Sequence, residues 1–243
     1  MTGTGRRAPW VLMYHSVGPT DDDPFRVTVS PRRFRAQMGA LRRAGLRGVS
    51  MRTLLTTPPG RLRDSMVGLT FDDGYCDFAD VAVPVLDEHG FDATVYVVTG
   101  RLGRTNDWEP HGPVKRIMTA ARVREVAALG MEVAAHGVEH RPLAGLPREE
   151  LVREVVESRL VLEDVLGTRV TGFAYPYGSV DVAAADAVRE AGYEHGVAVR
   201  VSPRHDAWTL PRTYVGEADS PVRLAAKYVR SLRDRAGDRG AAA

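Results

Sequence analysis

Two adjacent carboxylates, Asp72 and Asp73, end an apolar run in the segment VGLTFDDG, residues 67–74. Two carboxylates this close raise each other's pKa and destabilise the fold unless an opposite charge compensates them. A single aspartate here would be explained as a helix N-cap. Two aspartates after a strand instead favour a bound cation or a proton-transfer task, with one carboxylate as a ligand and the other as a base.

Two histidines with metal-ligand spacing follow later in the chain. His136 and His140 are four residues apart in HGVEH, so a helical turn would point both imidazoles the same way. Either histidine alone would be interpreted as structural. Together with a carboxylate from a neighbouring strand end, they form the nitrogen and oxygen set of catalytic zinc and related divalent ions. The sequence therefore predicts a divalent metal site.

Strand-like and helix-like segments alternate along the chain. Strands are expected over 9–14, 46–51, 66–71, 93–98, 131–135, 170–175, 195–199 and 209–215. Helices are expected over 30–45, 77–90, 119–130, 147–167, 181–192 and 219–235. This order predicts one α/β domain over residues 1–243, with a core of roughly 9–230 and a frayed tail at 231–243.

The candidate residues share one place in this pattern, because each follows the C-terminal end of a different strand. His15 follows the first strand, Asp72 and Asp73 the third, and His136 the strand at 131–135. In a closed barrel all of these strand ends form a single rim, whereas an open sheet brings together only those near its switch point. We therefore predict a barrel.

Three motifs, TFDDG (70–74), HGVEH (136–140) and FAYPYG (173–178), resemble those of the polysaccharide deacetylase family, carbohydrate esterase family four. The resemblance covers roughly residues 9–215. It implies a distorted (β/α) barrel with about seven parallel strands. It also implies metal-dependent removal of N-acetyl groups from amino sugars.

Carried over residue by residue, the resemblance assigns a role to each motif position. Asp72 becomes the general base, while Asp73, His136 and His140 become the metal ligands. Zn²⁺ is the expected cation, with Co²⁺ or Ni²⁺ as alternatives. The backbone N–H of Tyr177 is implied as a donor to the oxyanion of acyl transfer.

The chain departs from the family pattern in two ways that matter for catalysis. Ala174 stands where the family has an arginine that pairs with the catalytic aspartate, and Arg212 in LPRTYV is the candidate replacement. The late histidine motif that usually supplies the general acid is also missing. LMYHS instead resembles deacetylases of poly-β-1,6-N-acetylglucosamine, whose N-terminal histidine supplies the acid, which implies His15. His111 and His205, on loops expected at the same rim, are the alternatives.

Composition and charge limit the classes of binding partner and the cellular location that can be expected. A net charge of +2 without a run of like charges gives no sign of nucleic-acid binding. No segment approaches the ~20 apolar residues of a membrane span. The opening apolar run of about four residues is shorter than the roughly 7–15 of a signal peptide, and there is one cysteine, so a cytoplasmic location is expected. The oligomeric state is not predicted.

These observations lead to three hypotheses. The first is a metal-dependent hydrolase that removes N-acetyl groups from an N-acetylhexosamine-containing glycan, with the long loop at 100–116 shaping the substrate entrance. The second keeps this chemistry for a small N-acylated metabolite or natural-product intermediate in the cytosol. The third is a non-catalytic sugar-binding protein, which the paired carboxylates and histidines disfavour.

Overall fold

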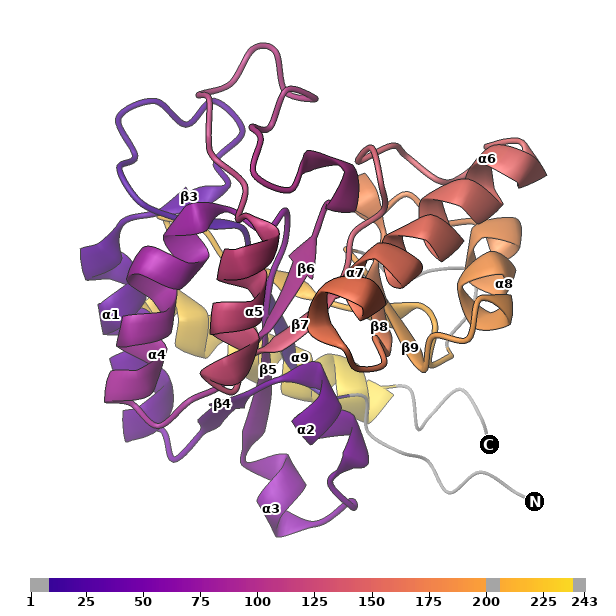
Figure 1. Ribbon diagram of the computed structural model, residues 1–243. Helices are drawn as coiled ribbons and strands as arrows, with labels where there is room; N and C mark the ends of the chain where they lie inside the picture. The colour runs from indigo at the N-terminus through magenta and orange to yellow at the C-terminus, as the bar shows by residue number, and fades with distance from the viewer. Residues whose placement is uncertain (1–8, 200–205, 238–243) are drawn as a thin grey trace, which may run out of the picture.

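Nine parallel strands form the central sheet of the part of the chain that the computed structural model describes, residues 9–199 and 206–237 (Figure 1). They are β1 (Val11–Tyr14), β4 (Arg47–Val49), β5 (Met66–Phe71), β6 (Thr94–Val97), β7 (Glu132–Ala135), β8 (Gly172–Ala174), β9 (His195–Ala198), β10 (Leu210–Pro211) and β11 (Thr213–Tyr214). Neighbours follow the order β10-β9-β8-β7-β6-β5-β1-β11, and β4 pairs with the first half of β5.

The segment around Arg212 nearly closes this sheet into a barrel. β10 pairs with β9, β11 pairs with β1, and Arg212 alone separates the two short strands. The Arg212 N–H donates to the Ala198 carbonyl at 3.1 Å, and the Val215 N–H donates to the Met13 carbonyl at 2.9 Å. One extended segment, predicted as the strand 209–215, therefore joins the two edges of the sheet. The predicted barrel is confirmed.

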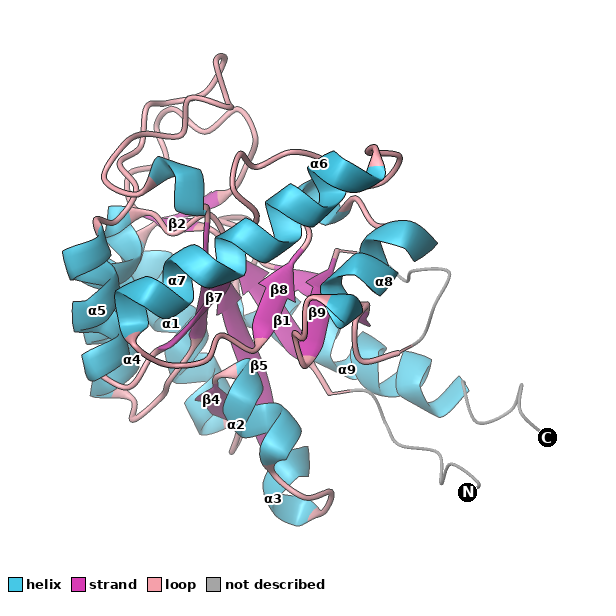
Figure 2. Cartoon of the chain, turned by 45° about the vertical axis from the view of Figure 1, so that its right-hand side comes forward, coloured by secondary structure: helices cyan, strands magenta, loops and turns pink. Residues whose placement is uncertain are grey.

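Helices pack around the outside of the sheet (Figures 1 and 2). They are α1 (Pro31–Arg43), α2 (Met51–Thr56), α3 (Arg61–Asp64), α4 (Val83–Glu88), α5 (Ala120–Ala128), α6 (Arg148–Val152), α7 (Ser158–Leu166), α8 (Val182–Glu190) and α9 (Pro221–Gly237). Helix α9 continues beyond residue 231, where the tail was expected to begin. No helix in the described ranges combines the length and apolar character that crossing a membrane requires.

Capping residues set the helix boundaries much as the sequence predicts. The Ser30 hydroxyl accepts the Arg33 N–H at the start of α1, and Gly45 ends the predicted segment with a φ of +72°. A second capping residue shows that the strand predicted over 46–51 is too long at its C-terminal end. Ser50 caps α2 by accepting the Thr53 N–H, so β4 ends at Val49.

Two of the predicted helices are interrupted by π-helical turns. The segment 77–90 contains η1 (Phe78–Ala82) before α4, and the segment 147–167 contains η3 (Arg153–Glu157) between α6 and α7. In the first, the Val83 N–H donates to the Phe78 carbonyl, and the wider register immediately precedes Pro84, which has no N–H to donate. Such turns often lie at functional sites, and η3 carries a carboxylate of the candidate site.

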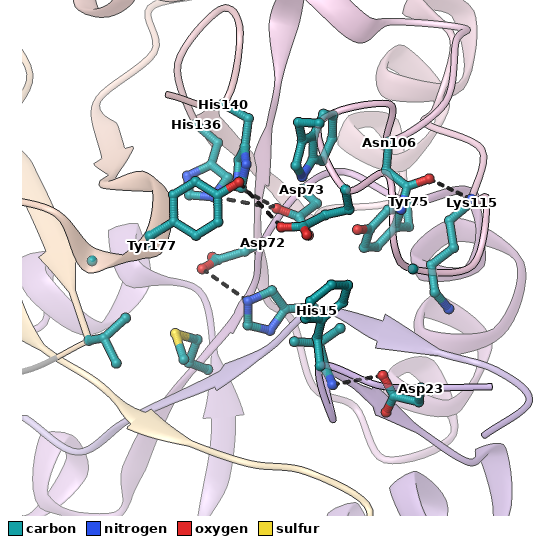
Figure 3. Close-up of a pocket in the computed structure, with 18 of the residues that line it drawn as sticks. His15, Asp23, Asp72, Asp73, Tyr75, Asn106, Lys115, His136, His140 and Tyr177 are labelled. Carbon is teal, nitrogen blue, oxygen red and sulfur yellow. Dashed lines mark hydrogen bonds and ion pairs between the residues drawn. The ribbon is translucent and has the colours of Figure 1, made fainter. Parts of the chain in front are cut away.

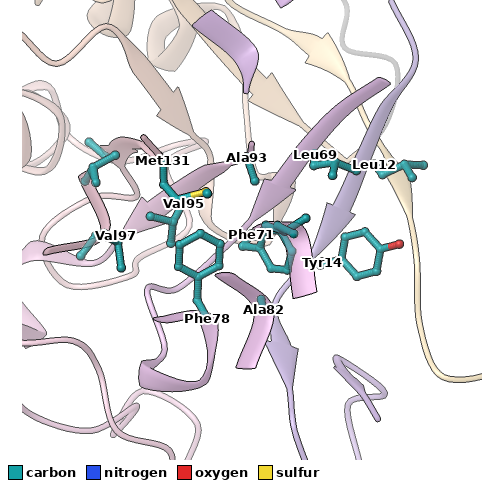
Figure 4. Packing of buried hydrophobic residues seen from close by; sticks show 14 of the residues in the cluster. Leu12, Tyr14, Leu69, Phe71, Phe78, Ala82, Ala93, Val95, Val97 and Met131 are labelled. Carbon is teal, nitrogen blue, oxygen red and sulfur yellow. The ribbon is translucent and has the colours of Figure 1, made fainter. Parts of the chain in front are cut away.

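Successive side chains along each strand point to opposite faces of the sheet, which produces two buried layers. Val95 and Val97 of β6 face the helices, in a cluster with Phe71 and Phe78 (Figure 4). Tyr96 points the opposite way, into a smaller cluster inside the barrel whose other members include Ala134, Ala174 and Val197. Arg212 is also buried, and its guanidinium carbon lies 5.6 Å from the centroid of the Tyr96 ring.

Long loops cover the C-terminal rim of the barrel, and α2 and α3 lie at the opposite end (Figures 1 and 2). Two short strands that the sequence did not predict, β2 (Ser16–Val17) and β3 (Thr28–Val29), pair in parallel and hold the ends of the loop at 18–27. A second loop runs from β6 to α5. The rim is therefore walled by two separate segments.

Candidate active site

Side chains from three strand ends converge at the C-terminal rim (Figure 3). Asp72 and Asp73 directly follow β5, His136 follows β7, and His15 follows β1. Together with His140 they line a cavity of about 300 Å³. The structure thus brings together the acidic and imidazole groups that the sequence placed on separate strands, as the geometry of a closed barrel requires.

Asp73, His136 and His140 form a set of three buried groups suited to a divalent cation. One ligand atom of each lies within 4.8 Å of the others. Asp73 Oδ1 is 3.5 Å from His136 Nε2 and 3.3 Å from His140 Nε2, and it has no hydrogen-bond partner among the described residues. A buried carboxylate oxygen without a donor fits a metal ligand, and the two-nitrogen, one-oxygen set fits zinc. Burial raises the pKa of Asp73, but the two imidazoles outweigh it, so this pKa lies well below its usual value.

The turn between the two histidines is held by Glu154 of η3, which the sequence analysis did not identify. This buried carboxylate accepts the N–H groups of Val138 at 2.8 Å and Glu139 at 3.0 Å. Gly137 has a φ of +79°, and a Cβ there would lie 2.9 Å from Glu154 Oε2. The glycine is therefore required both by the turn and by the close approach of this carboxylate.

Asp72 is paired with Arg212, which comes from the segment that closes the barrel. Arg212 Nη1 donates to Asp72 Oδ1 at 2.6 Å, and Nη2 donates to Oδ2 at 2.7 Å. Burial raises the pKa of Asp72, but the charge of Arg212, with smaller effects from His136 and His15, holds that pKa below its usual value. Asp72 is therefore ionised at neutral pH. Ala174, where the resemblance implied an arginine, lies in the inner cluster instead.

Among the candidate proton donors, His15 lines the cavity, and its Nε2 lies 4.0 Å from Asp72 Oδ2. His111 is exposed and is not among the residues that line the cavity. His205 lies outside the described residues. Within the described ranges, the geometry therefore favours His15 over His111.

Backbone strain is concentrated at this rim. Four non-glycine residues in the described ranges have a left-handed φ, and three of them line the cavity: Asp73 at 73°, His140 at 56° and Tyr177 at 57°. A left-handed backbone is costly for side chains with a Cβ and persists where surrounding contacts impose it, often at functional sites. Tyr177, in the turn η4 (Pro176–Gly178), is half-exposed.

The loop at 100–116 walls the cavity, as the sequence predicted. It contributes Asn106, Trp108, Glu109 and Lys115 to the lining, while Phe25 comes from the facing loop. None of these residues was predicted individually from the sequence. The aromatic and charged segment NDWEP, in a long loop after a strand, is the signal that could have found them.

The chain is therefore a (β/α) barrel that gathers two imidazoles and two buried carboxylates at its C-terminal rim, the face where such barrels carry their active sites. The family model for "Polysaccharide deacetylase" matches residues 60–196, more than half of the sequence. The chain belongs to the polysaccharide deacetylase family.

Two relatives found by sequence are YxkH of Bacillus subtilis and chitin deacetylase 1 of Cryptococcus neoformans. YxkH is 26% identical over 189 residues, which cover 77% of this chain and 63% of YxkH. Chitin deacetylase 1 is 26% identical over 114 residues, which cover 47% of this chain and 21% of that protein. The chain thus spans less than two thirds of the length of either relative.

Solved structures share the fold over nearly the whole chain. The Streptococcus pyogenes deacetylase PplD, in complex with acetate, has a TM-score of 0.75 at 24% identity, covering 90% of this chain and 97% of PplD. IcaB from Ammonifex degensii has a TM-score of 0.73 at 25% identity, covering 91% of this chain and 97% of IcaB. These likenesses confirm the predicted fold.

Proposed function

We propose that this protein is a metal-dependent N-deacetylase of an N-acetylhexosamine-containing glycan. The observation that carries the proposal is the meeting of two sets of groups in one cavity. Asp73, His136 and His140 form a cation site, and the ionised Asp72 stands beside it with His15. Amide hydrolysis needs a base, an acid and stabilisation of the developing negative charge, and this cavity offers groups for all three.

Asp73, His136 and His140 would hold the cation, with Zn²⁺ preferred by the ligand set and Co²⁺ or Ni²⁺ as alternatives. When bound, the cation would polarise the acetyl carbonyl and a neighbouring water molecule. The chain's own residues then move the protons. Asp72 takes one proton from the water molecule as the water oxygen attacks the acetyl carbon. His15 gives a proton to the nitrogen as the C–N bond breaks, so that acetate and a free amine leave.

Arg212 and Tyr177 have supporting roles in this proposal. Arg212 holds the Asp72 carboxylate through both oxygens, and it keeps that base ionised and oriented. The Tyr177 backbone, at the cavity edge, supplies an N–H to the oxyanion. This second role rests on the YPYG motif and on the place of Tyr177 in the lining.

A glycan substrate is favoured by the name of the relative chitin deacetylase 1 and by the family itself. Within glycans, poly-β-1,6-N-acetylglucosamine is favoured by the histidine after the first strand, through the resemblance of the LMYHS motif. A small N-acylated metabolite is the alternative, since a cavity of about 300 Å³ lies at the lower end of the range for small-molecule sites.

Acetate release tests this function directly. The purified protein, stripped of metal by chelation, is offered a panel of N-acetylated glycans and small N-acetyl amides, with and without added Zn²⁺, Co²⁺ or Ni²⁺. We expect metal-dependent acetate release from at least one glycan. Release from small amides alone would support the second hypothesis. Full activity after exhaustive chelation would contradict the metal mechanism, and sugar binding without release would support the binding-protein hypothesis.

A further inference from the structure

Metal-ligating histidines are usually oriented by a hydrogen bond at the ring nitrogen that does not bind the metal. His136 has such a bond, because its Nδ1 lies 2.8 Å from the Ala174 carbonyl oxygen. His140 differs, since its Nδ1 is buried and has no hydrogen-bond partner in the part of the chain that the structure describes. Other contacts must orient this ring.

Two aromatic rings flank the His140 imidazole. The Trp108 ring lies at a centroid distance of 4.6 Å with an interplanar angle of 32°, and the Tyr177 ring lies at 4.6 Å with an angle of 61°. Both distances are within the range of roughly 4.5–7 Å in which ring pairs attract. Figure 3 shows Tyr177 beside His140 at the cavity edge. The flanking rings come from separate segments, the loop 100–116 and the YPYG turn.

The Tyr177 ring and the loop that carries Trp108 are themselves held in place by hydrogen bonds. The Tyr177 hydroxyl donates to Glu109 Oε1 at 3.2 Å, and Glu109 is the neighbour of Trp108 in the chain. Asn106, two residues before Trp108, accepts the Lys115 N–H at 2.6 Å, which braces the loop across its base. The loop therefore holds Trp108 and fastens Tyr177 at the same time.

The start of this loop also contacts the turn between the two histidines. The Gly100 N–H donates to the Val138 carbonyl at 2.9 Å, and Arg101 Nη1 lies 2.6 Å from Glu139 Oε2. Displacement of the loop would therefore disturb the backbone between the ligands as well as the ring contact. These contacts connect the wall of the substrate cavity to the ligand set.

We propose that Trp108 is a positioning residue of the metal site. Its indole, with the Tyr177 ring opposite, holds the His140 imidazole in the orientation that the cation requires. The entrance loop is then a structural part of the metal centre as well as a wall of the cavity. This inference rests on the proposed function in one respect, the assignment of a cation to Asp73, His136 and His140.

Zn²⁺ affinity, measured by competition with a chromophoric chelator on the full chain, tests this role separately from activity. Trp108→Ala should bind Zn²⁺ ~10–100-fold more weakly, the usual cost of losing an outer-shell partner. Trp108→Phe keeps a ring and should recover most of that loss. Val114→Ala, in the same loop but 80% exposed, is the matched control and should bind like the wild type.

The possible outcomes separate the role of Trp108 from the proposed metal-dependent function. If Trp108→Ala binds Zn²⁺ as tightly as the wild type and only raises KM, Trp108 merely lines the substrate cavity and the inference is wrong. Failure of Trp108→Phe to recover affinity would also contradict it. A wild-type protein that does not bind Zn²⁺ would overturn the proposed function itself.

Tryptophan fluorescence separately tests the premise that Trp108 lies beside the bound cation, and it does not need the Trp108→Ala variant. Paramagnetic Co²⁺ or Ni²⁺ bound beside His140 should quench the emission of Trp108, whereas Trp10 and Trp208 do not line the cavity. Metal-induced quenching should therefore be seen in the wild type and be largely lost in Trp108→Phe. Quenching that persists undiminished in Trp108→Phe would overturn the inference.

Discussion

Arg212 and Asp72 are joined by two hydrogen bonds, of 2.6 and 2.7 Å, across 140 residues of sequence. Both side chains are buried, and Arg212 lies in the short segment that joins β9 to β1. The contact therefore links closure of the barrel to the orientation of the proposed base. Removing one partner of such a buried pair strongly lowers stability, because the other partner is left as an uncompensated buried charge.

Arg212→Met should lower the free energy of unfolding by ~3–5 kcal/mol, the usual cost of breaking a buried ion pair. Adding Asp72→Asn removes the stranded carboxylate and should restore part of this stability. Arg212→Lys keeps the charge but not the two-point contact, so kcat should fall by up to ~10²-fold, as for a misplaced catalytic group. Denaturant unfolding and steady-state kinetics measure these effects. A double variant no more stable than Arg212→Met would contradict the coupling.

The two adjacent aspartates should separate in a metal assay. Asp73→Ala, His136→Ala and His140→Ala should each lose metal and activity together, because a site with three protein ligands tolerates little loss. Asp72→Asn should retain its metal and lose ~10²–10⁴-fold in kcat, the typical contribution of a general base. Metal content by elemental analysis, measured beside kcat, decides the matter. If Asp72→Asn loses metal to the extent of Asp73→Ala, the two roles are reversed.

Glu154 should affect the metal site without being a ligand. Glu154→Leu leaves the buried Val138 N–H and the half-buried Glu139 N–H without this acceptor, which should cost ~1–3 kcal/mol for the first group and less for the second. Metal affinity should fall ~10–100-fold, as for other outer-shell changes, and Glu154→Gln should be milder because it keeps an acceptor oxygen. Glu157→Leu, on the same π-helical turn but exposed, is the matched control. Equal effects of Glu154→Leu and Glu157→Leu would show that the turn needs no such support.

Much of the barrel and the candidate ligand set could be predicted because the signals are local. The run of apolar residues before Asp72 predicts β5. The spacing of His136 and His140 predicts a shared direction, and both imidazoles lie against Asp73. The expected helical turn between them is wrong, because this segment is a non-helical turn with a left-handed backbone at Gly137 and His140. Each of these signals is contained within a few residues of the sequence. The meeting of these residues at one rim then follows from the rule that the ends of parallel strands lie on one side of a barrel.

The supporting residues could not be predicted, because their surroundings are set by tertiary contacts. Glu154 lies in PREELVREVVE, where a glutamate normally belongs to a solvated helix face, and the helix buries it at the π-helical turn. Trp108 is one aromatic residue in a long loop until the fold places it against His140. The partner of Arg212 depends on which strand closes the barrel, a contact 140 residues away in the chain.

A buried histidine outside the cavity should make stability depend on pH. His195, at the start of β9, is fully buried with Nε2 3.2 Å from the Tyr96 hydroxyl. Burial holds the pKa of His195 below its usual value, despite opposing effects of Glu132 and Glu194. At pH 7 and above the ring is neutral in both states and contributes nothing. Below about pH 6.5 the unfolded chain takes up a proton that the folded protein does not, so folding loses stability.

The expected result is a steeper loss in the wild type than in His195→Gln between pH 7 and pH 5. The difference in unfolding free energy should change by up to about 1.4 kcal/mol per pH unit, the limit for one proton. Urea unfolding of both proteins across this window measures it. Because the other histidines are common to both proteins, their effects cancel in the comparison. Parallel curves for the two proteins would mean that His195 takes up its proton equally well in the folded state.

The role of His15 can be tested by the leaving group. An amide nitrogen must be protonated as it departs, because an amine anion is too basic to leave, whereas an aryl oxide leaves without a proton. Imidazole is the side chain suited to this transfer near neutral pH, and His15 lies on the cavity wall 4.0 Å from Asp72. His15→Ala should therefore slow hydrolysis of an N-acetyl amide by ~10²-fold or more, while an aryl acetate should be affected much less. Metal content should be unchanged.

The role of His15 is decided by comparing its effect on the amide with its effect on the aryl acetate. Equal slowing of the amide and the ester would indicate that His15 supports the structure of the site and transfers no proton. His111→Ala provides the matched comparison, because His111 is exposed and outside the cavity lining, and it should leave both rates unchanged. His205→Ala tests the remaining candidate. If it slows the amide selectively while His15→Ala slows neither substrate, the acid comes from the late loop and the assignment of His15 is wrong.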